Sequence, residues 1–339
     1  MTIPVQRIIT IREASQVGGL RRQAAALATE AGFGDAETGR VSLIATELAN
    51  NLVLHAGHGR VLLQLIQNGE TRELELLSID SGPGMNVPAS LRDGYSSAGT
   101  AGQGLGAISR ASDEFEAYSQ IDKGTVIMSR VRIASDRLQP PTQSLWRWGA
   151  INAAAPGETA IGDTWLLRPN NADMCVMMAD GLGHGPLAAE AAHAAAGVFE
   201  NETFGSLSTF YTRAHALLRS TRGAAIATAL CPGAQNTLEF AGVGNISSSI
   251  MTRAGTSKHL MSHNGTVGAE MRPVKTLAYD WRAGDRIIMH SDGLTTRWSF
   301  KDYPEIMDYH PAIHAALLFR DHVRGKDDAT VLVLERALG

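Results

Sequence analysis

Five acidic residues in the second half of the chain have the type and the position that divalent-metal chemistry needs. Asp163 begins an apolar run, Asp180 and Asp292 each end one, and Asp327 and Asp328 precede another. A single acid at a strand end is most often a turn former. Several acids at one place repel one another unless a cation joins them, and oxygen ligands favour Mg²⁺ or Mn²⁺. The pattern therefore predicts a binuclear metal site that lowers the pKa of a bridging water and binds a phosphoryl group.

Two of these acids are predicted to face each other across a hairpin. The apolar runs that follow Asp163 and precede Asp180 flank the turn-rich segment Pro169-Asn-Asn-Ala-Asp173. Opposed residues of an antiparallel hairpin are equidistant from its turn, so a turn centred near Asn171 and Ala172 makes Asp163 and Asp180 partners. Both carboxylates then lie at the open end of the hairpin.

Short motifs around the acids carry a family resemblance. They are Gly162-Asp163, Ala179-Asp-Gly-Leu-Gly-His-Gly185, Arg222-Gly-Ala-Ala, Gly242-Val-Gly-Asn245, Ser291-Asp-Gly-Leu294 and Lys326-Asp-Asp-Ala-Thr330. Together they resemble the metal-dependent type 2C (PPM) serine/threonine phosphatases of the SpoIIE/RsbX branch, over residues 147 to 336. The resemblance implies an α-β-β-α sandwich and hydrolysis of phosphoserine or phosphothreonine by a metal-activated water.

The same resemblance implies individual roles. Asp163 and Asp180 would be catalytic because they hold the ions that activate water. The implied metal ligands are Asp163, Asp180, Asp292, Asp327, Asp328 and the Gly181 carbonyl, with Asp328 standing where many relatives have Asn. No arginine near Asp163 matches the phosphate-binding arginine of the larger eukaryotic branch, so substrate phosphate would depend on the metals and the partner's surface.

A second group of chemistry-bearing residues lies in the first half of the chain. Glu47 and Asn51 are four residues apart on a predicted helix, about 38 to 56, beside its apolar stripe. Asp80 ends an apolar strand and is followed by Gly82 and Gly84. Its carboxylate can accept from the amino group of a base, while the glycines let backbone approach the ring.

A glycine-rich segment then runs into a helix predicted over about 104 to 112. Gly102, Gly104, Leu105 and Gly106 would place backbone amides at the N-terminus of that helix, where phosphate binds favourably. Thr125 opens a later strand and would close the base pocket. The glycine pattern alone is not specific. It gains specificity from the order of four elements along the chain: the helix with Glu47 and Asn51, the loop after Asp80, the glycine-rich segment and the strand that begins near Thr125.

These elements resemble the GHKL, or Bergerat, ATP-binding fold, and within it the RsbT/RsbW-type serine kinases and anti-sigma factors, over residues 1 to about 133. The resemblance implies an α/β sandwich that binds ATP with Mg²⁺. Asn51 would coordinate the Mg²⁺, Glu47 would orient or deprotonate the acceptor hydroxyl, and Asp80 would recognise adenine. The other implied ATP contacts are Gly82, Gly84, Gly102, Gly104, Leu105, Gly106 and Thr125.

The length fits two domains, and the pattern of predicted helices and hairpin-connected strands indicates an α+β protein. The chain has 339 residues, and Pro140-Pro141 lies in a polar stretch that predicts a linker over 135–146 between domains 1–134 and 147–339.

A formal charge of -4 indicates no general affinity for nucleic acid or anionic membrane. Two distant cysteines support neither a disulfide framework nor a zinc-thiolate site. With no export signal or membrane span in the sequence, we expect a cytoplasmic protein.

The combined interpretation is a bifunctional partner-switching regulator. The resemblances imply an ATP-dependent serine/threonine kinase with Mg²⁺ and a phosphatase with two Mn²⁺ or Mg²⁺ ions, both acting on small STAS-domain proteins upstream of a sigma factor or another switch partner. An alternative is that the first domain only binds ATP or sequesters a partner and regulates the phosphatase. A third interpretation, that the protein is a purely structural scaffold, is disfavoured because the acids are grouped as in a metal site. The sequence does not decide whether the chain forms a homodimer.

Overall fold

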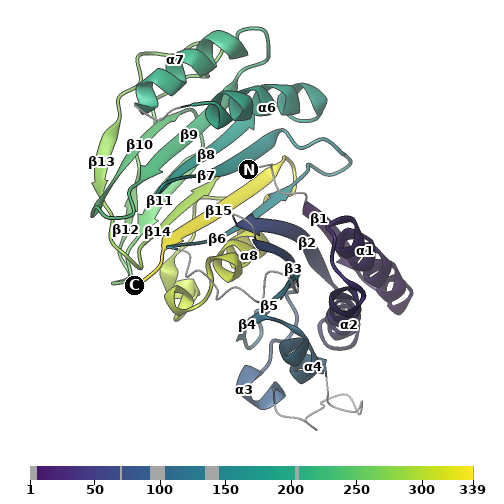
Figure 1. Cartoon of the computed structure of the whole chain (residues 1–339). Helices are drawn as coiled ribbons and strands as arrows, with labels where there is room; N and C mark the ends of the chain where they lie inside the picture. The colour runs from purple at the N-terminus through teal and green to yellow at the C-terminus, as the bar shows by residue number, and fades with distance from the viewer. Residues whose placement is uncertain (1–5, 69–70, 92–103, 134–144, 203–205, 339) are drawn as a thin grey trace. The chain divides into compact units, whose positions relative to one another are not determined.

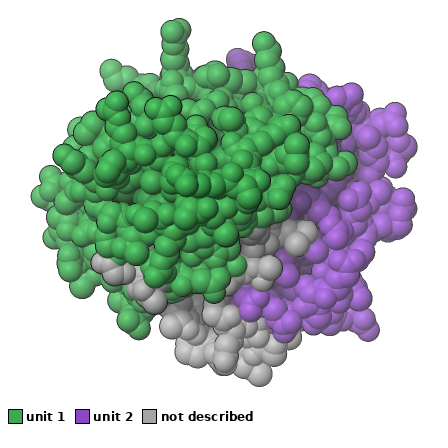
Figure 2. Space-filling model, turned by 90° about the horizontal axis from the view of Figure 1, so that it is seen from above, with its two compact units in different colours: residues 1–3, 144–339 green, residues 4–143 purple. Residues whose placement is uncertain are grey.

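The computed structural model describes residues 6–68, 71–91, 104–133, 145–202 and 206–338. The chain divides into two compact units, Pro4–Gln143 and Ser144–Gly339, with Met1–Ile3 assigned to the second (Figure 2). The predicted linker lies outside the described residues except for its last two positions. None of the described helices combines the length and the apolar character that crossing a membrane requires.

The first unit is an α/β sandwich, as predicted. Its five strands are antiparallel and follow the order β1-β2-β3-β5-β4 (Figure 1). Its elements, in chain order, are β1 Gln6–Ile11, η1 Ala14–Gln16, α1 Val17–Glu30, α2 Asp35–Asn51, η2 Leu52–Ala56, β2 Gly59–Asn68, β3 Thr71–Ile79, α3 Val87–Ser90, α4 Gly104–Ala111, β4 Glu114–Gln120 and β5 Gly124–Arg132.

Helix α2 positions the first predicted site. The apolar side chains of Val41, Ile44 and Leu48 recur at helical spacing and are fully buried in the core beneath α1 and α4. Glu47 and Asn51 lie on the neighbouring, half-buried face. The helix then continues as one π-helical turn, η2, a feature that often accompanies functional sites.

The second unit contains two antiparallel five-stranded sheets. Their strand orders are β13-β10-β9-β8-β7 and β12-β11-β14-β15-β6 (Figure 1). Its elements are β6 Trp146–Ala153, β7 Asp163–Asn170, β8 Asp173–Gly181, α6 Pro186–Glu200, α7 Leu207–Leu218, β9 Ala224–Cys231, β10 Thr237–Val243, β11 Ser247–Met251, β12 Ser257–His259, β13 Leu277–Asp280, β14 Arg286–His290, η3 Phe300–Asp302, η4 Ile306–Asp308, α8 Pro311–His322 and β15 Ala329–Arg336.

The two sheets pack between helices, which gives the predicted α-β-β-α sandwich. Helices α6 and α7 cover the first sheet and α8 covers the second. In β8, Cys175, Met177 and Ala179 pack in the core under α6 and α7. On the opposite face of that sheet, the ring of Trp165 lies 5.2 Å from that of Trp148 in the other sheet. Because both faces are covered, the strand is apolar almost throughout.

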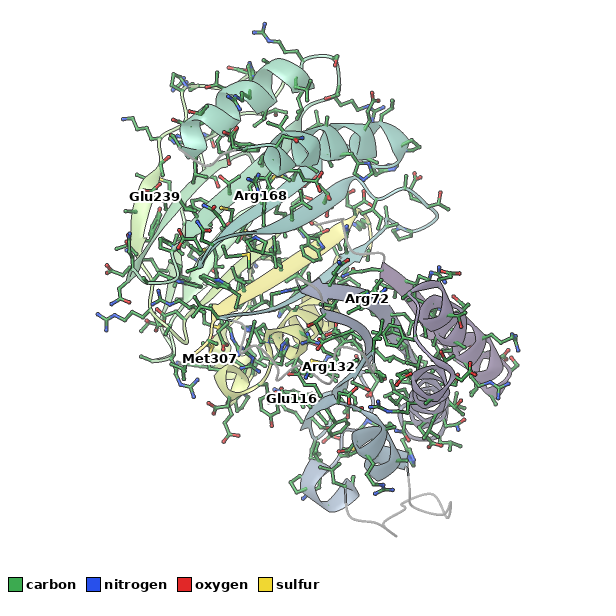
Figure 3. All side chains as sticks on the ribbon, viewed as in Figure 1. Arg72, Glu116, Arg132, Arg168, Glu239 and Met307 are labelled. Carbon is green, nitrogen blue, oxygen red and sulfur yellow. The ribbon has the colours of Figure 1, made fainter. Side chains whose placement is uncertain are left out.

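An arginine side chain of the second unit binds backbone where a helix ends. Arg168 of β7 donates to the carbonyl oxygens of Phe199 and Glu200, both at 2.8 Å, at the C-terminus of α6 (Figure 3). The last carbonyls of a helix have no partner inside it and carry partial negative charge. Arg168 therefore both satisfies and neutralises the end of α6.

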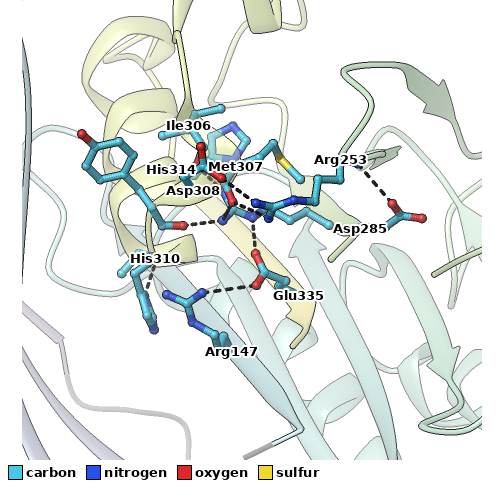
Figure 4. Close-up of polar contacts among 12 residues, drawn as sticks. Arg147, Arg253, Asp285, Ile306, Met307, Asp308, His310, His314 and Glu335 are labelled. Atoms are coloured by element: carbon cyan, nitrogen blue, oxygen red, sulfur yellow. Dashed lines mark hydrogen bonds and ion pairs between the residues drawn. The ribbon is translucent and has the colours of Figure 1, made fainter. Parts of the chain in front are cut away.

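Another arginine, which is fully buried, binds the segment before α8. Arg286 of β14 is paired with Glu335 of β15 at 2.7 Å, and Glu335 also pairs with Arg147 at 3.3 Å (Figure 4). The Arg286 guanidinium donates to the carbonyl oxygens of Ile306, Met307 and Tyr309. A buried charge is tolerated when it is paired and its hydrogen bonds are satisfied, as they are here.

Gly149→Ala should destabilise the second unit. A Cβ at this β6 position would overlap backbone atoms of Ala312 in α8, so the helix would have to move. We expect a loss of about 3 kcal/mol in the free energy of unfolding. All five tryptophans lie in this unit, so urea unfolding followed by tryptophan fluorescence reports it selectively.

The matched control is Gly197→Ala in α6. That position faces open space, and Ala favours helix over Gly by about 1 kcal/mol, so the variant should be as stable as the parent or more so. Equal stability of the two variants would contradict the tight packing of β6 against α8.

Candidate functional site

The predicted pairing of Asp163 with Asp180 is confirmed. The two residues are register partners at the open end of the β7–β8 hairpin. The ladder there is closed by a backbone bond of 2.9 Å from the Gly181 N–H to the Gly162 carbonyl. Strand pairing thus places two carboxylates directly opposite each other, although their mutual repulsion is unfavourable.

The second sheet brings the other acids to the same place. In the antiparallel pair β14–β15, His290 lies opposite Val331, so Asp292 follows one strand where Asp327 and Asp328 precede the other. The approach is close, because a Cβ on Gly293 would overlap the Asp328 carbonyl. Backbone and hydroxyl bonds between Ser291 and Thr330 join the two strand ends.

Electrostatics show that the five carboxylates form one group. Burial, followed by the charges of the four other acids, raises the pKa of Asp180 to about 9. Burial raises the pKa of Asp163 to about 7; the Ser291 and Thr330 hydroxyls oppose this rise, and Asp328 and Asp292 add to it. Neighbouring carboxylates disfavour ionisation because like charges repel in a poorly solvated place.

This arrangement of charge fits a cation. The Asp163 Oδ2 atom is buried and has no hydrogen-bond partner within the described part of the chain. A buried carboxylate oxygen without a partner is costly, and a divalent ion would satisfy it. Among the described residues, however, no three Asp, Glu, His or Cys side chains form a preassembled metal-binding cluster.

Asp328 has a distinct position in the group. Its two carboxylate oxygens accept the N–H groups of Ala155 and Gly162, each at 2.7 Å. Burial raises the pKa of Asp328 and these two bonds lower it. The side chain thereby binds the two ends of the loop that leads into Asp163.

Several polar residues around the acids were not assigned from the sequence. Asn245, in the β10–β11 turn, donates to Asp292 Oδ2 at 2.7 Å. Asn152 of β6 donates to the Asp163 carbonyl at 3.3 Å and accepts from the Thr330 hydroxyl at 2.8 Å. Asn245 ends a motif noted in the sequence, whereas no local pattern marks Asn152.

In the first unit, the structure gathers Asp80, Gly82, Gly84 and Thr125 at the ends of β3 and β5. Asp80 Oδ1 accepts the N–H groups of Gly82 at 2.8 Å and Thr125 at 3.1 Å. Gly124 has a φ of 93° and lies so close to Asp80 that any Cβ would overlap the Asp80 carbonyl. Gly84 lies equally close to the Gln120 carbonyl in the β4–β5 turn.

Glu47 and Asn51 meet the first residue of α4. A Cβ on Gly104 would lie 3.3 Å from Asn51 Oδ1 and 3.4 Å from Glu47 Oε2. The predicted contact Gly102 lies outside the described residues. Leu105 and Gly106 are in the first turn of α4, where the Leu105 side chain belongs to the hydrophobic core and only backbone could contact a ligand.

Both units have relatives among known proteins. Residues 11–130 match the family described as "Histidine kinase-like ATPase domain", and residues 170–337 match that described as "Stage II sporulation protein E (SpoIIE)". The serine/threonine-protein kinase RsbT of Bacillus subtilis (strain 168) is 33% identical over 104 residues, which cover 30% of this chain and 78% of RsbT. The chain therefore belongs to the RsbT family of histidine kinase-like ATPase domains.

The second unit has its own relatives. The phosphoserine phosphatase RsbX of Bacillus subtilis (strain 168) is 25% identical over 138 residues, covering 41% of this chain and 69% of RsbX. A solved structure described as "The bacterial stressosome: a modular system that has been adapted to control secondary messenger signaling" matches at 27% identity with a TM-score of 0.52, over 56% of this chain and 99% of that one. This unit therefore resembles SpoIIE domains and is similar in sequence to a phosphoserine phosphatase.

Asp180→Asn should stabilise the second unit when divalent ions are removed with EDTA. The raised pKa of Asp180 means that its charge opposes folding above pH 4, and the neutral amide removes that cost. We expect a gain of about 1 kcal/mol at pH 7 that disappears as the pH falls to the ordinary pKa of Asp. Urea unfolding monitored by tryptophan fluorescence measures it.

Asp280→Asn, an exposed acid on β13, is the control and should change little. A loss of stability in Asp180→Asn at pH 7 would contradict the electrostatic strain described above.

Proposed function

We propose that this chain is a bifunctional partner-switching regulator, in which the first unit phosphorylates Ser or Thr on STAS-domain proteins and the second unit removes the phosphate. The observation that supports the proposal is that two units on one chain have different relatives: one is similar to a kinase over 104 residues and the other to a phosphatase over 138 residues. Opposed activities on one chain suit a switch that sets a phosphorylation level.

In the first unit the proposed cofactor is ATP with Mg²⁺. Asp80 would accept from the adenine amino group, since its Oδ1 is already aligned by two backbone N–H bonds. Asn51 would contribute to Mg²⁺ binding and Glu47 would orient the acceptor hydroxyl, next to the start of α4. Phosphoryl transfer needs mainly positioning and charge neutralisation, which a small set of residues can supply.

In the second unit we propose that Asp163, Asp180, Asp292 and Asp327 hold two Mn²⁺ or Mg²⁺ ions, with the Gly181 carbonyl. When bound, such ions supply Lewis acidity and lower the pKa of water. The protein's own contribution is placement: the β7–β8 register opposes two of the acids, and Asn245 orients Asp292. We assign Asp328 to positioning the Ala155 to Gly162 loop, in addition to the ligand role implied by resemblance.

Two exposed leucines support a protein as the substrate of the second unit. Leu182, 56% exposed, lies two residues beyond Asp180, and Leu187, 51% exposed, is in the first turn of α6. Contiguous apolar surface beside a polar site is typical of surfaces that bind another protein, and these two leucines are close in sequence on the segment after Asp180. A cytoplasmic STAS-domain phosphoprotein, with a sigma factor or another switch protein downstream, is the partner we propose.

Asn51→Ala should abolish phosphorylation. The wild-type chain, incubated with Mg²⁺, radiolabelled ATP and a panel of STAS-domain proteins from the same genome, should label at least one of them. The variant should lose at least about 100-fold of the initial rate, because the Mg²⁺-bound phosphates are no longer positioned. Asn50→Ala, the neighbour on the same helix, is the control. ATP binding without transfer to any protein, together with ATP-dependent change in phosphatase activity, would instead support a regulatory nucleotide-binding unit.

Asp180→Ala should have the opposite effect on the phosphoprotein. Without this acid the second unit loses a ligand for the ions, so phosphoprotein made by the intact first unit should accumulate and persist after ATP is removed. Native or Phos-tag gels measure its decay, with Asp280→Ala as the control. Decay at the wild-type rate in Asp180→Ala would rule out the proposed phosphatase site.

A further inference from the structure

Substrate phosphate at the acid group of the second unit would need a positive partner from the protein, because the group itself consists of acids. Five carboxylates form its centre, and the residues adjoining Asp163 in the sequence are Gly162 and Thr164, neither of them a cation. A phosphate monoester carries close to two negative charges, so it needs positive partners besides any ions held by the acids.

Strand register places Arg222 beside this group. The β8–β9 ladder pairs Asp180 with Ala225 and Gly181 with Ala224. It continues beyond the strands through a 3.0 Å bond from the Leu182 N–H to the Gly223 carbonyl. The next opposed positions are Gly183 and Arg222.

The side chain of Arg222 extends toward Gly183, the residue opposite it. Its Nη1 atom lies 3.1 Å from the point where a Cβ on Gly183 would stand. The Gly183 carbonyl in turn lies 3.5 Å from the corresponding point on Gly162, the residue before Asp163. The guanidinium therefore lies over the Gly183 turn, which joins Asp180 to α6.

The charge of Arg222 is available for a ligand. Its side chain is exposed, and within the described part of the chain it has no hydrogen bond or ion pair. Three other arginines of this unit are engaged: Arg168 caps α6, Arg213 pairs with Glu202 at 3.3 Å, and Arg286 pairs with Glu335. A guanidinium presents a planar fork of donors that matches two oxygens of a phosphate.

We propose that Arg222 binds the phosphate of the phosphoserine or phosphothreonine substrate in the second unit, as a positioning contact to its non-bridging oxygens. The inference rests on the phosphatase function proposed above. Arg222 takes no part in bond making or breaking, so its loss should weaken binding more than it slows the chemical step.

The test compares full-length Arg222→Ala, Arg222→Lys and Arg219→Ala with the wild type. Arg219 is an exposed arginine at the end of α7 and serves as the matched control. With Mn²⁺ present, hydrolysis of p-nitrophenyl phosphate and of a phosphoserine peptide is measured, together with inhibition by inorganic phosphate. For Arg222→Ala we expect both KM values and the inhibition constant of phosphate to rise about tenfold with kcat little changed, because a charge-assisted contact is lost. Arg222→Lys should lie between it and the wild type.

Phosphate affinities of Arg222→Ala equal to those of Arg219→Ala would overturn the proposal, as would a fall in kcat alone accompanied by loss of stability. Calorimetric titration of inorganic phosphate into the Mn²⁺-loaded chain separates this inference from the proposed function. If the wild type hydrolyses neither substrate but binds phosphate through Arg222, the phosphatase assignment fails and the site stands. If the wild type hydrolyses the substrates but Arg222→Ala binds phosphate as tightly as the wild type, the phosphatase assignment stands and the proposed role of Arg222 fails.

Discussion

The second unit depends on one electrostatic constraint: strand pairing forces Asp163 and Asp180 to lie opposite each other at a poorly solvated sheet end. Neither residue can avoid the other without breaking the register of β7 and β8, which the apolar cores on both faces of the sheet maintain. The cost appears in the raised pKa values of both acids and in Asp163 Oδ2, which has no hydrogen-bond partner among the residues that the structure describes. A fold that sustains such a cost without a cation has to obtain stability elsewhere.

That stability comes from the layers around the site. The Trp148–Trp165 contact joins the two sheets, and the alternating apolar residues of β8 fill the space under α6 and α7. Arg168 and Arg286 satisfy carbonyls at the end of α6 and before α8, so the helices that cover the sheets are themselves fixed by polar bonds. The acids are thus positioned by strands whose packing and covering helices are fixed. Such fixed positioning is needed to hold groups that repel one another close enough to share a ligand.

Local regularities made much of this predictable from the sequence. Turn-centred pairing was sufficient to oppose Asp163 and Asp180, and helical periodicity identified the buried stripe of α2 with Glu47 beside it. Contacts between residues that are far apart in the sequence and meet only in the folded sheets could not be predicted in this way. Arg222 reaches Gly183 because β8 and β9 are neighbours in the sheet, although two helices separate them in the chain. Asn152 reaches Asp163 and Thr330 across different strands, and no spacing in the sequence encodes that contact.

The candidate sites of the two units differ in their electrostatics. In the first, a carboxamide, a carboxylate and the start of a helix meet at Gly104, so any Mg²⁺ there would arrive with the nucleotide's own charge. In the second, five carboxylates repel a phosphate unless cations are already bound, and Arg222 alone cannot reverse that sign. Under the proposed function, ATP would bring its metal to the kinase site, whereas the phosphatase site would have to be loaded beforehand. The balance between phosphorylation and its reversal would then depend on how fully divalent ions occupy the second unit, which makes the strained acid group the point at which the switch is set.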